Sequence, residues 1–317
     1  MNLSDLSLRD IEAVVAVADS RHFGRAAESL RVAQPTLSAQ VRKVERLLGV
    51  EVFERTGRSF LVTPEGERLL PLMRDLLTRA RSMADEARAR EGAEAAPLRV
   101  GVIPTLGPYV VPHVLGRGRR GPALAISEHT TGILLQRLRE GAIDVAMISL
   151  PAAHETLETL TLFDEPFALV MPRGHALARA ARLGPSMLSA SEMVLLEEGH
   201  CLRDQSLALC NRRGGSSPRL VTTSLETLKY LVAAGEGYSL LPLLSTRLSS
   251  ELAALVEVRR FDEGAPSRRI VLCSRSTSAR GAEIAGLGAW IADRVRPVLA
   301  EFAARADRAT ARRRRAT

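Results

Sequence analysis

Apolar residues in the first sixty positions recur with the spacing of short amphipathic helices. Three such segments follow one another, at residues 11–19, 25–30 and 35–48, separated by short breaks at 22–24 and 31–33. Two short helices joined by a tight turn are typical of a helix-turn-helix, whose second helix enters the major groove of DNA. In the third segment, apolar residues spaced i, i+4, i+7 and i+11 predict one inward helix face: Leu37, Val41, Val44 and Leu48.

The same region is basic on its remaining surface. Residues 21–58 carry eight Lys and Arg against four Glu. Pro35 suits the first turn of a helix, where its missing N–H loses no hydrogen bond. Alternating apolar and polar residues around Gly57 predict a small hairpin, or wing. A plain helical domain with a solvated basic face is the alternative that this pattern also allows.

A long helix is predicted after the wing, because residues 67–90 contain no glycine. Apolar residues there step alternately by three and four, which is the pattern of a coiled-coil seam: Leu70, Met73, Leu77, Ala80, Ala84 and Ala87. We therefore expect a winged helix-turn-helix domain at residues 6–63 and a dimerisation helix at 64–91. The alternative is an amphipathic helix that packs only on its own domain.

Beyond residue 97 strand-like runs alternate with helical ones. LRVGVI, ALAIS and VAMISL are strand-like, TGILLQRLREGAI is helical, and a second alternating set begins at FALVMP. Such alternation implies parallel sheets with helices outside them. The chain is thus predicted to be α/β, with a two-lobed, Rossmann-like domain at residues 97–303.

The boundaries of the two predicted lobes follow from a late strand, IVLCSR, that returns to the first set. Lobe I would comprise about 97–165 and 270–303, and lobe II about 166–269. A ligand would bind between the lobes, at the carboxyl ends of the strands.

Composition narrows the class of protein. The chain has 317 residues and a net charge of +8, but most of this charge lies after residue 304, where the sequence contains six arginines and Asp307 as its one acidic residue. Residues 304–317 are therefore expected to form a solvated, disordered tail. No run approaches the roughly 20 apolar residues of a membrane helix, and the N-terminus does not resemble a signal peptide. These features favour a cytoplasmic protein that does not bind membranes.

Three cysteines without a CxxC motif or a Cys/His ligand spacing argue against a disulfide scaffold and a zinc site. We expect no metal and no cofactor. Two cysteines lie nine positions apart in GHCLRDQSLALC, residues 199–210, and Cys273 lies in a strand pattern typical of an unreactive core residue. Cys201 precedes a predicted helix, beside His200 and Arg203, a setting that favours the thiolate. Cys210 lies at an apolar helical position.

The N-terminal segment RHFGRAAESLRVAQPTLSAQVRKVERLLGVEVFERTGRSFLVTPEG resembles the winged helix-turn-helix of LysR-type transcriptional regulators. The resemblance implies double-stranded DNA and RNA polymerase as partners, and a homodimer or homotetramer. It also implies a periplasmic-binding-protein-like effector domain. Ala33 departs from the Ser or Thr usual at the N-cap, which should cost about 1 kcal/mol. The implied groove residues are Gln34, Pro35, Thr36, Ser38 and Arg42, and the implied phosphate or minor-groove contacts are Arg9, Arg55 and Arg58.

Further segments resemble the peroxide-sensing members of that family: GVIPTLGPYVVPH, LFDEPFALVMPRGH, LEEGHCLRDQSLALC and TSLETLKYLVAAGEGYSLLP. The resemblance implies that hydrogen peroxide oxidises Cys201 to a sulfenic acid, which Cys210 converts to a disulfide. The implied peroxide-binding residues are Thr105, Thr131, His200, Asp204 and Arg275. Residues 116–125 and 210–218 do not match.

Helix geometry sets a condition on this disulfide. If residues 202–210 are helical, a rise of about 1.5 Å per residue separates the two Cα atoms by roughly 13 Å. A disulfide requires about 7 Å or less. The segment must therefore unwind, and oxidation would exchange one packing of it for another.

Two other functions remain open at this stage. A LysR-type regulator could instead bind a small metabolite between the lobes, and peroxide would then leave its DNA binding unchanged. A thiol peroxidase with a DNA-binding extension would instead sustain peroxide turnover with a thiol reductant. The leading hypothesis is a regulator and not an enzyme.

Overall fold

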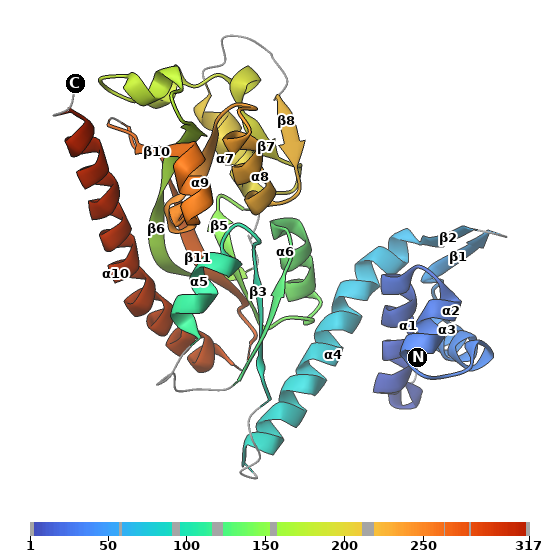
Figure 1. The fold of residues 1–317 in the computed structure, drawn as a ribbon. Coiled ribbons are helices and arrows are strands. Elements are labelled where there is room, and N and C mark those ends of the chain that lie inside the picture. Colours follow the sequence, from blue (N-terminus) through green and yellow to red (C-terminus); the bar gives the residue numbers. More distant parts are fainter. Residues whose placement is uncertain are drawn as a thin grey trace. The chain divides into compact units, whose positions relative to one another are not determined.

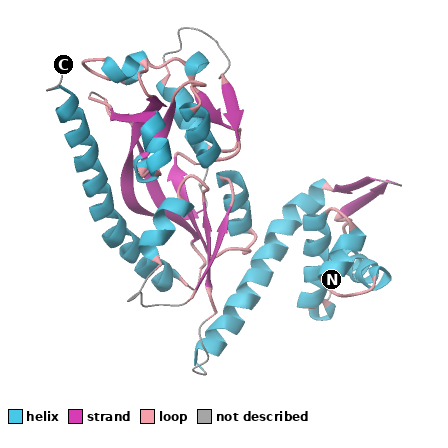
Figure 2. Cartoon of the chain, viewed as in Figure 1, coloured by secondary structure: helices cyan, strands magenta, loops and turns pink. Residues whose placement is uncertain are grey.

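The computed structural model describes residues 3–56, 59–90, 96–115, 123–152, 157–210, 219–262, 264–278 and 280–314 (Figure 1). The chain falls into two units. The N-terminal unit comprises residues up to 96 together with 139–142, and the C-terminal unit comprises the rest, from Pro97 onward. Figure 2 shows that helices dominate the N-terminal unit, whereas strands and helices alternate in the C-terminal unit.

Capping side chains determine where the first helices of the N-terminal unit begin. A short 3-10 helix, η1 (Leu3–Asp5), precedes α1 (Leu8–Ser20). At the start of α1, the Ser7 hydroxyl accepts from Asp10 N while the Asp10 carboxylate accepts from Ser7 N, a capping box. Asp10 also pairs with Lys43 at 2.7 Å, which ties α1 to the third helix. At α2 (Phe23–Ser29) the His22 ring nitrogen Nδ1 accepts from two backbone amides.

The third helix and the wing follow the predicted pattern. α3 (Gln34–Leu48) begins after Ala33, which makes no side-chain cap, as expected. Of the residues predicted to face inward, Leu48 is half-buried. The other three are fully buried: Leu37, Val41 and Val44. Strands β1 (Phe53–Thr56) and β2 (Ser59–Val62) pair antiparallel as the hairpin. The helix-turn-helix prediction is confirmed.

The coiled-coil seam predicted for the long helix α4 (Pro64–Arg90) is wrong in its first half. Leu70, Met73 and Leu77 are buried in the N-terminal unit's own core, where α4 packs against α1. These apolar residues come soon after the wing in the sequence, and their side chains complete the hydrophobic core of the N-terminal unit. The apolar side chains that α4 exposes are instead Leu72, Leu76 and Met83, which are 66%, 44% and 71% exposed. The side chain of Ala87 lies outside the described residues.

Lobe I of the C-terminal unit is a mixed sheet in the order β4-β3-β5-β11-β6. Its strands are β3 (Leu98–Val102), β4 (Leu124–Glu128), β5 (Val145–Leu150), the first part of β6 (Leu157–Pro172) and β11 (Ser267–Arg275). Only β3, β4 and β5 are mutually parallel, because β11 returns from lobe II and pairs antiparallel with both neighbours. The expectation of wholly parallel sheets is thus corrected.

Three helices cover the two faces of this sheet. α5 (Gly107–Val114) and α10 (Gly281–Arg314) pack together on one face, and α6 (Thr131–Arg139) covers the other (Figure 1). The backbone of α10 stays helical to Arg314, so the prediction of a disordered tail from residue 304 is wrong over these positions. Ala and Arg are strong helix formers, and cations near a helix C-terminus interact favourably with its dipole.

Lobe II is built on the second part of β6, which passes from one lobe to the other. There β6 pairs with β9 (Ser239–Pro242) and β10 (Val256–Arg260), while β7 (Val194–Leu196) pairs with β8 (Leu220–Thr222). The helices are α7 (Cys201–Leu209), α8 (Leu225–Ala233) and α9 (Ser250–Leu255), with 3-10 turns η2–η4 between residues 176 and 192 and η5 at 243–246. No described helix is both long and apolar enough to cross a membrane.

Two polar contacts between the lobes bear on the candidate site. Tyr109 of α5 packs against both lobe cores and hydrogen-bonds Glu226 of α8. Lys229, also on α8 and buried, donates to Glu226 at 2.7 Å and to the Tyr109 hydroxyl at 3.2 Å. The second contact, made by α7, belongs to the candidate site.

Two neighbouring ion pairs between β6 and β11 point to opposite faces. In the register of these strands Arg268 faces Glu165 and Arg269 faces Asp164. Successive side chains in a strand alternate between faces. The Arg268–Glu165 pair, at 2.8 Å, is fully buried (0% and 0% exposed), whereas the side chains of Arg269 and Asp164 are more than half exposed (57% and 54%).

We predict that Arg268→Met destabilises the protein far more than Arg269→Met. The first change leaves a buried carboxylate without its partner, which typically costs about 3 kcal/mol or more. The second removes a solvated pair worth about 1 kcal/mol or less. Urea denaturation of both variants measures the difference. Equal losses of stability would contradict the stated roles of the two pairs.

Candidate functional site

The two cysteines of the GHCLRDQSLALC segment lie at opposite ends of α7. Cys201 is its first residue, His200 is the N-cap without a side-chain cap bond, and Cys210 is the C-cap. Both thiols are free. With a rise of about 1.5 Å per residue, the Cα atoms lie roughly 13 Å apart, too far for a disulfide. In this arrangement the thiols cannot react with each other.

The Cys201 end of α7 is docked onto lobe I. Cys201 is half-buried and packs against the lobe I core. Gly199, with φ of +91°, lies against Thr130, because a Cβ built there would be 3.8 Å from the Thr130 methyl carbon. One turn further along α7, Gln205 Nε2 donates to Ser149 Oγ at 2.8 Å and to the Leu150 carbonyl at 3.1 Å. Cys201 therefore lies between the lobes, near the first residues of α6.

Two buried polar atoms in this region have no hydrogen-bond partner within the described residues. They are Thr131 Oγ1, at the first residue of α6, and Gln205 Oε1. Gln205 is four residues after Cys201 and so shares its helix face. Buried polar groups are normally hydrogen-bonded, so these two atoms are candidates for binding a small polar ligand. The sequence prediction omitted Gln205, although its i+4 spacing from Cys201 could have identified it.

Thr105 is held by a residue that the sequence prediction also omitted, Arg268. The Arg268 guanidinium donates to Thr105 Oγ1 at 2.8 Å and to the Thr105 carbonyl at 3.0 Å, while its Nε donates to Glu165 at 2.9 Å. The remaining Glu165 oxygen accepts from Leu244 N at 2.8 Å. Arg268 occupies one lone pair of the Thr105 hydroxyl as a donor, so the hydroxyl proton is left for another acceptor.

Arg275, proposed from the resemblance, lies elsewhere. It ends β11, seven residues after Arg268, which at about 3.3 Å per residue separates the two by roughly 23 Å. Its guanidinium donates to the backbone carbonyls of Leu138 and Ile143. We therefore correct the expected role of Arg275 from peroxide binding to support of the segment that follows α6.

The residues flanking Cys201 differ in what they can contribute. Burial lowers the pKa of His200, opposed by the nearby Glu197 carboxylate. Its imidazole is thus neutral at pH 7, so it can hydrogen-bond but adds no positive charge, contrary to expectation. Arg203 donates to the Leu196 carbonyl at 3.1 Å. Asp204 is exposed, so the structure does not bring it into the buried surface around Cys201.

Cys210 and Cys273 are both buried thiols, but in different cores. Cys210 lies in the lobe II core, 7% exposed, with Sγ 3.1 Å from Met193 Sδ and 3.4 Å from the Ser206 carbonyl. Burial raises its pKa. Cys273 lies in the lobe I core, and burial raises its pKa to about 11. Both therefore stay protonated at neutral pH, and Cys273 fits the predicted unreactive role.

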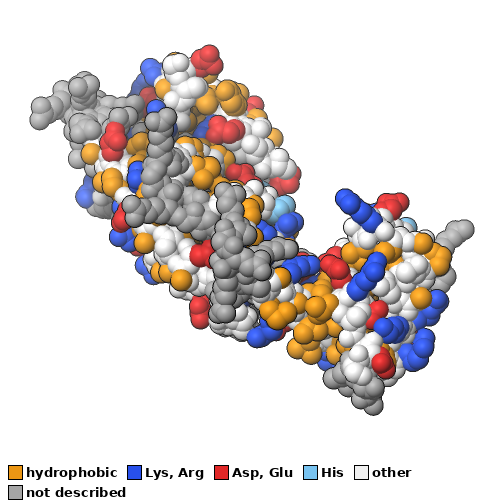
Figure 3. All heavy atoms as spheres, turned by 90° about the horizontal axis from the view of Figure 1, so that it is seen from below, with side chains coloured by type: hydrophobic (Ala, Val, Ile, Leu, Met, Phe, Trp, Pro, Cys, Tyr) orange, Lys and Arg blue, Asp and Glu red, His pale blue; other side chains and the backbone are white. Residues whose placement is uncertain are grey.

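The predicted DNA-contacting residues lie mostly on the surface of the N-terminal unit. Gln34, Pro35 and Thr36 are exposed at the start of α3, and Arg42 is exposed one turn beyond the half-buried Ser38. In the space-filling view, Lys and Arg side chains gather on one side of this unit (Figure 3). Arg9 is also exposed. The side chain of Arg55, and all of Arg58, lie outside the described residues.

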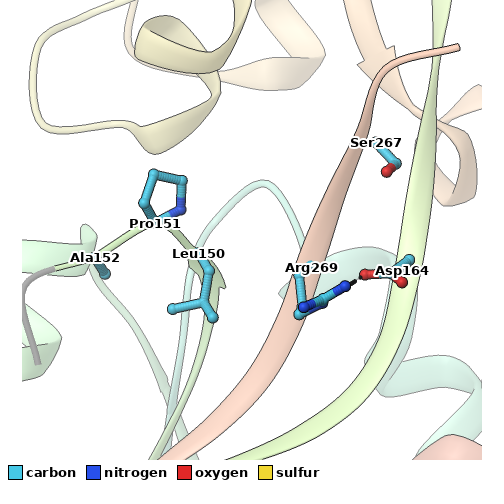
Figure 4. A pocket seen from close by; sticks show the side chains of 6 residues that line it. All are labelled: Leu150, Pro151, Ala152, Asp164, Ser267 and Arg269. Atoms are coloured by element: carbon cyan, nitrogen blue, oxygen red, sulfur yellow. Dashed lines mark hydrogen bonds and ion pairs between the residues drawn. The ribbon is translucent and has the colours of Figure 1, made fainter. Parts of the chain in front are cut away.

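An open hollow of about 420 Å³ is lined by the end of β5, the start of β11 and the middle of β6 (Figure 4). Leu150, Asp164 and Arg269 oppose one another in the register and share its face, opposite to that of Arg268 and Thr105. Figure 4 shows Arg269 and Asp164 pointing toward each other, 3.0 Å apart. A ligand that uses the Arg269 guanidinium would have to break this ion pair. Within the described residues, no cluster of His, Cys, Asp and Glu could hold a metal ion.

Comparison with known proteins identifies the family of both units. Residues 8–67 match the bacterial regulatory helix-turn-helix proteins of the lysR family, and residues 91–296 match the LysR substrate binding domain. A probable hydrogen peroxide-inducible genes activator from Streptomyces viridosporus is 38% identical, over 92% of this chain and 95% of that protein. The DNA-binding transcriptional dual regulator OxyR of Escherichia coli is 38% identical, over 76% of this chain and 80% of that protein.

Solved structures of OxyR proteins are similar to the chain over most of its length. A full-length OxyR variant from Pseudomonas aeruginosa, with one cysteine replaced by aspartate, is 36% identical, with a TM-score of 0.73, over 90% of this chain and 94% of that one. A hydrogen-peroxide-bound mutant of Corynebacterium glutamicum OxyR is 33% identical, with a TM-score of 0.57, over 94% of this chain and 95% of that one. The chain belongs to the LysR family of bacterial regulatory helix-turn-helix proteins.

Proposed function

We propose that this protein is a DNA-binding transcriptional regulator of the oxidative-stress response, switched by hydrogen peroxide through Cys201 and Cys210. One observation carries the proposal. Cys201 begins α7 between the lobes, and two buried polar atoms near this end of the helix, Gln205 Oε1 and Thr131 Oγ1 of α6, have no hydrogen-bond partner within the described residues. A small ligand that both donates and accepts hydrogen bonds would satisfy them, and hydrogen peroxide does both. The relatives named for peroxide-inducible activation support the same reading.

The first proposed step is oxidation of Cys201. Its thiolate Sγ attacks one peroxide oxygen, the S–O bond forms, the O–O bond breaks, and sulfur loses two electrons. The departing hydroxide takes a proton and leaves as water. The Thr105 and Thr131 hydroxyls and the neutral His200 imidazole are the proposed donors to this oxygen. Arg268 acts indirectly, because it fixes the Thr105 hydroxyl.

The second proposed step joins the two ends of α7. Cys210 Sγ attacks Cys201 Sγ, the S–S bond forms, the S–O bond breaks, and the hydroxide takes the Cys210 proton to form water. Because the helix holds the sulfurs apart, α7 must unwind and Cys210 must leave the lobe II core. The oxidised lobe is then packed differently, and this change is the signal passed to the rest of the regulator.

The cysteine variants should separate the two steps. Cys201→Ser should abolish the peroxide response, since the attacking sulfur is lost. Cys210→Ser should still consume one peroxide but stop at the sulfenic acid or a mixed disulfide. Mass-spectrometric thiol counts before and after one equivalent of peroxide measure both outcomes.

Cys273→Ala is the matched control and should respond like the parent. Sustained peroxide turnover with a thiol reductant would instead identify a thiol peroxidase. An unchanged thiol count, with DNA binding insensitive to peroxide, would favour a regulator that binds a metabolite between the lobes. Oxidation of Cys201 no faster than that of Cys273 would refute the proposal.

We further propose that α3 reads the DNA sequence and that arginines at its margins contact phosphate. Gln34, Pro35, Thr36, Ser38 and Arg42 are the proposed groove residues, and Arg9, Arg55 and Arg58 the proposed phosphate or minor-groove contacts. Base-edge contacts carry specificity, whereas phosphate contacts position the protein and make binding salt-dependent. RNA polymerase is a proposed partner, and the cytoplasm the proposed location.

Gln34→Ala should change the sequence preference of DNA binding, whereas Arg9→Ala should weaken binding to all sequences. Loss of one phosphate contact should also lower the slope of log K against log salt by about 1. Salt titrations by fluorescence anisotropy on specific and scrambled duplexes measure both effects. Arg247→Ala, exposed on the C-terminal unit, is the control and should match the parent. If the Gln34→Ala and Arg9→Ala variants also bind DNA like the parent, the assignment of these two residues to the DNA interface is wrong.

A homodimer, or a homotetramer formed by further pairing of effector domains, is also part of the proposal. Its support is the row of exposed apolar side chains on α4, Leu72, Leu76 and Met83. An exposed apolar row on a long helix is the type of surface that a second helix covers. The buried residues Leu70, Met73 and Leu77 are excluded from this interface.

Replacing Leu72 and Leu76 together with Asp should yield folded monomers, because charges would then line the interface. Sedimentation at micromolar concentration measures the mass, and circular dichroism measures the helix content. Met73→Asp should instead reduce stability, since Met73 lies in the domain core. If the double variant still forms dimers, the dimer interface lies on the C-terminal unit and not on α4.

A further inference from the structure

The thiol of Cys210 touches a second sulfur whose role the proposed chemistry leaves unexplained. Met193 Sδ lies 3.1 Å from Cys210 Sγ, and the Met193 side chain is fully buried. The two residues are 17 positions apart in the sequence, so the contact is made by tertiary packing of α7 against the strand region before β7.

The backbone of Met193 is anchored on both sides. Its N–H donates to the Ala190 carbonyl and its carbonyl accepts from Arg219 N, both at 3.1 Å, and it forms an isolated β-bridge with Tyr238. Met193 therefore belongs to the fixed part of lobe II, whereas Cys210 belongs to the helix that must unwind. The contact between the two sulfurs therefore joins α7, which must unwind, to the part of lobe II that keeps its structure.

The thiol proton of Cys210 has two acceptors within reach, Met193 Sδ and the Ser206 carbonyl. A thioether is a weak acceptor but a polarisable one, and it packs closely against another sulfur. The Ser206 carbonyl lies on α7 and moves with Cys210, so it does not bind the thiol to lobe II. Of these two acceptors, only Met193 resists withdrawal of the thiol.

We infer that Met193 is a positioning residue that retains the resolving thiol of Cys210 in the lobe II core and so slows disulfide formation. This inference rests on the proposed function. Met193 should not affect the first step, because Cys201 packs against the lobe I core at the other end of α7. It should affect the second step, in which Cys210 Sγ bonds to Cys201 Sγ and the sulfenic oxygen departs with the Cys210 proton as water.

The test compares Met193→Leu with Met171→Leu in the full-length reduced protein. Both methionines are fully buried in the lobe II core, and within the described residues only Met193 of the two accepts a hydrogen bond from Cys210, so the control makes the same change without removing that bond. After mixing with one equivalent of peroxide, acid quenching and alkylation at successive times give two rates by mass spectrometry. The first is the loss of the Cys201 thiol, and the second is the appearance of the Cys201–Cys210 disulfide.

For Met193→Leu we expect an unchanged first rate and a second rate roughly threefold faster, the size of effect that a weak hydrogen bond supports. Met171→Leu should leave both rates unchanged. Met193→Ile, which also lacks sulfur, provides a second variant should the leucine variant not fold. A merely structural role would change the urea midpoint and both rates together, and would not separate the two steps.

Several results would overturn the inference. An unchanged or slower second rate in Met193→Leu and Met193→Ile would show that the thioether does not retain the thiol. Equal acceleration by Met171→Leu would assign the effect to general loosening of the lobe II core. Failure of the parent protein to form any Cys201–Cys210 disulfide would instead refute the proposed function itself, and the two failures are thus distinguishable.

Discussion

The separation of two sulfurs by one short helix is the constraint on which the C-terminal unit depends. As long as α7 is helical, Cys201 contacts lobe I and Cys210 stays inside lobe II. The helix also carries Gln205, whose amide binds Ser149 and Leu150 and so fastens lobe II to lobe I. Local helical geometry therefore determines both the chemistry that the thiols can undergo and the contact between the lobes.

Buried charge stabilises the region where the lobes meet. Arg268 donates hydrogen bonds to both Glu165 and Thr105, and Glu165 also accepts one from Leu244 N. On α8, Lys229 and Glu226 reach Tyr109 of lobe I. Such pairs contribute little net stability compared with apolar packing, but removal of one partner is costly, so they favour one arrangement strongly. The site around Cys201 is thereby built on fixed neighbours.

Periodicity predicted those parts of the fold that depend on local sequence. The inward face of α3, the alternation of strands and helices, and a helix directly after Cys201 were predicted from spacing along the chain, and the structure begins that helix one residue earlier, at Cys201. Features set by distant segments did not follow. α4 has two apolar faces, and only the packing of α1 decides that Leu70, Met73 and Leu77 are inside.

The same limit applied to the site. Arg268 and Arg275 lie on one strand, and their sequence context does not reveal which one reaches Thr105, because this depends on the register of β11 with β6. Gln205 could have been predicted as a site residue, because it lies four positions after Cys201 in the sequence. The contact of Met193 with Cys210 has no local signature, since 17 residues separate the two.

The burial of Cys210 also bears on how long a response to the oxidant would last. A regulator that binds an effector reversibly follows the concentration of that effector from moment to moment. A regulator whose signal is a covalent bond between two ends of an unwound helix keeps a record of exposure after the oxidant has gone. In the proposed mechanism, the reset would depend on whether a reductant can reach the sulfurs and on how readily α7 re-forms and returns Cys210 to the lobe II core. The duration of the response is therefore a property of the fold.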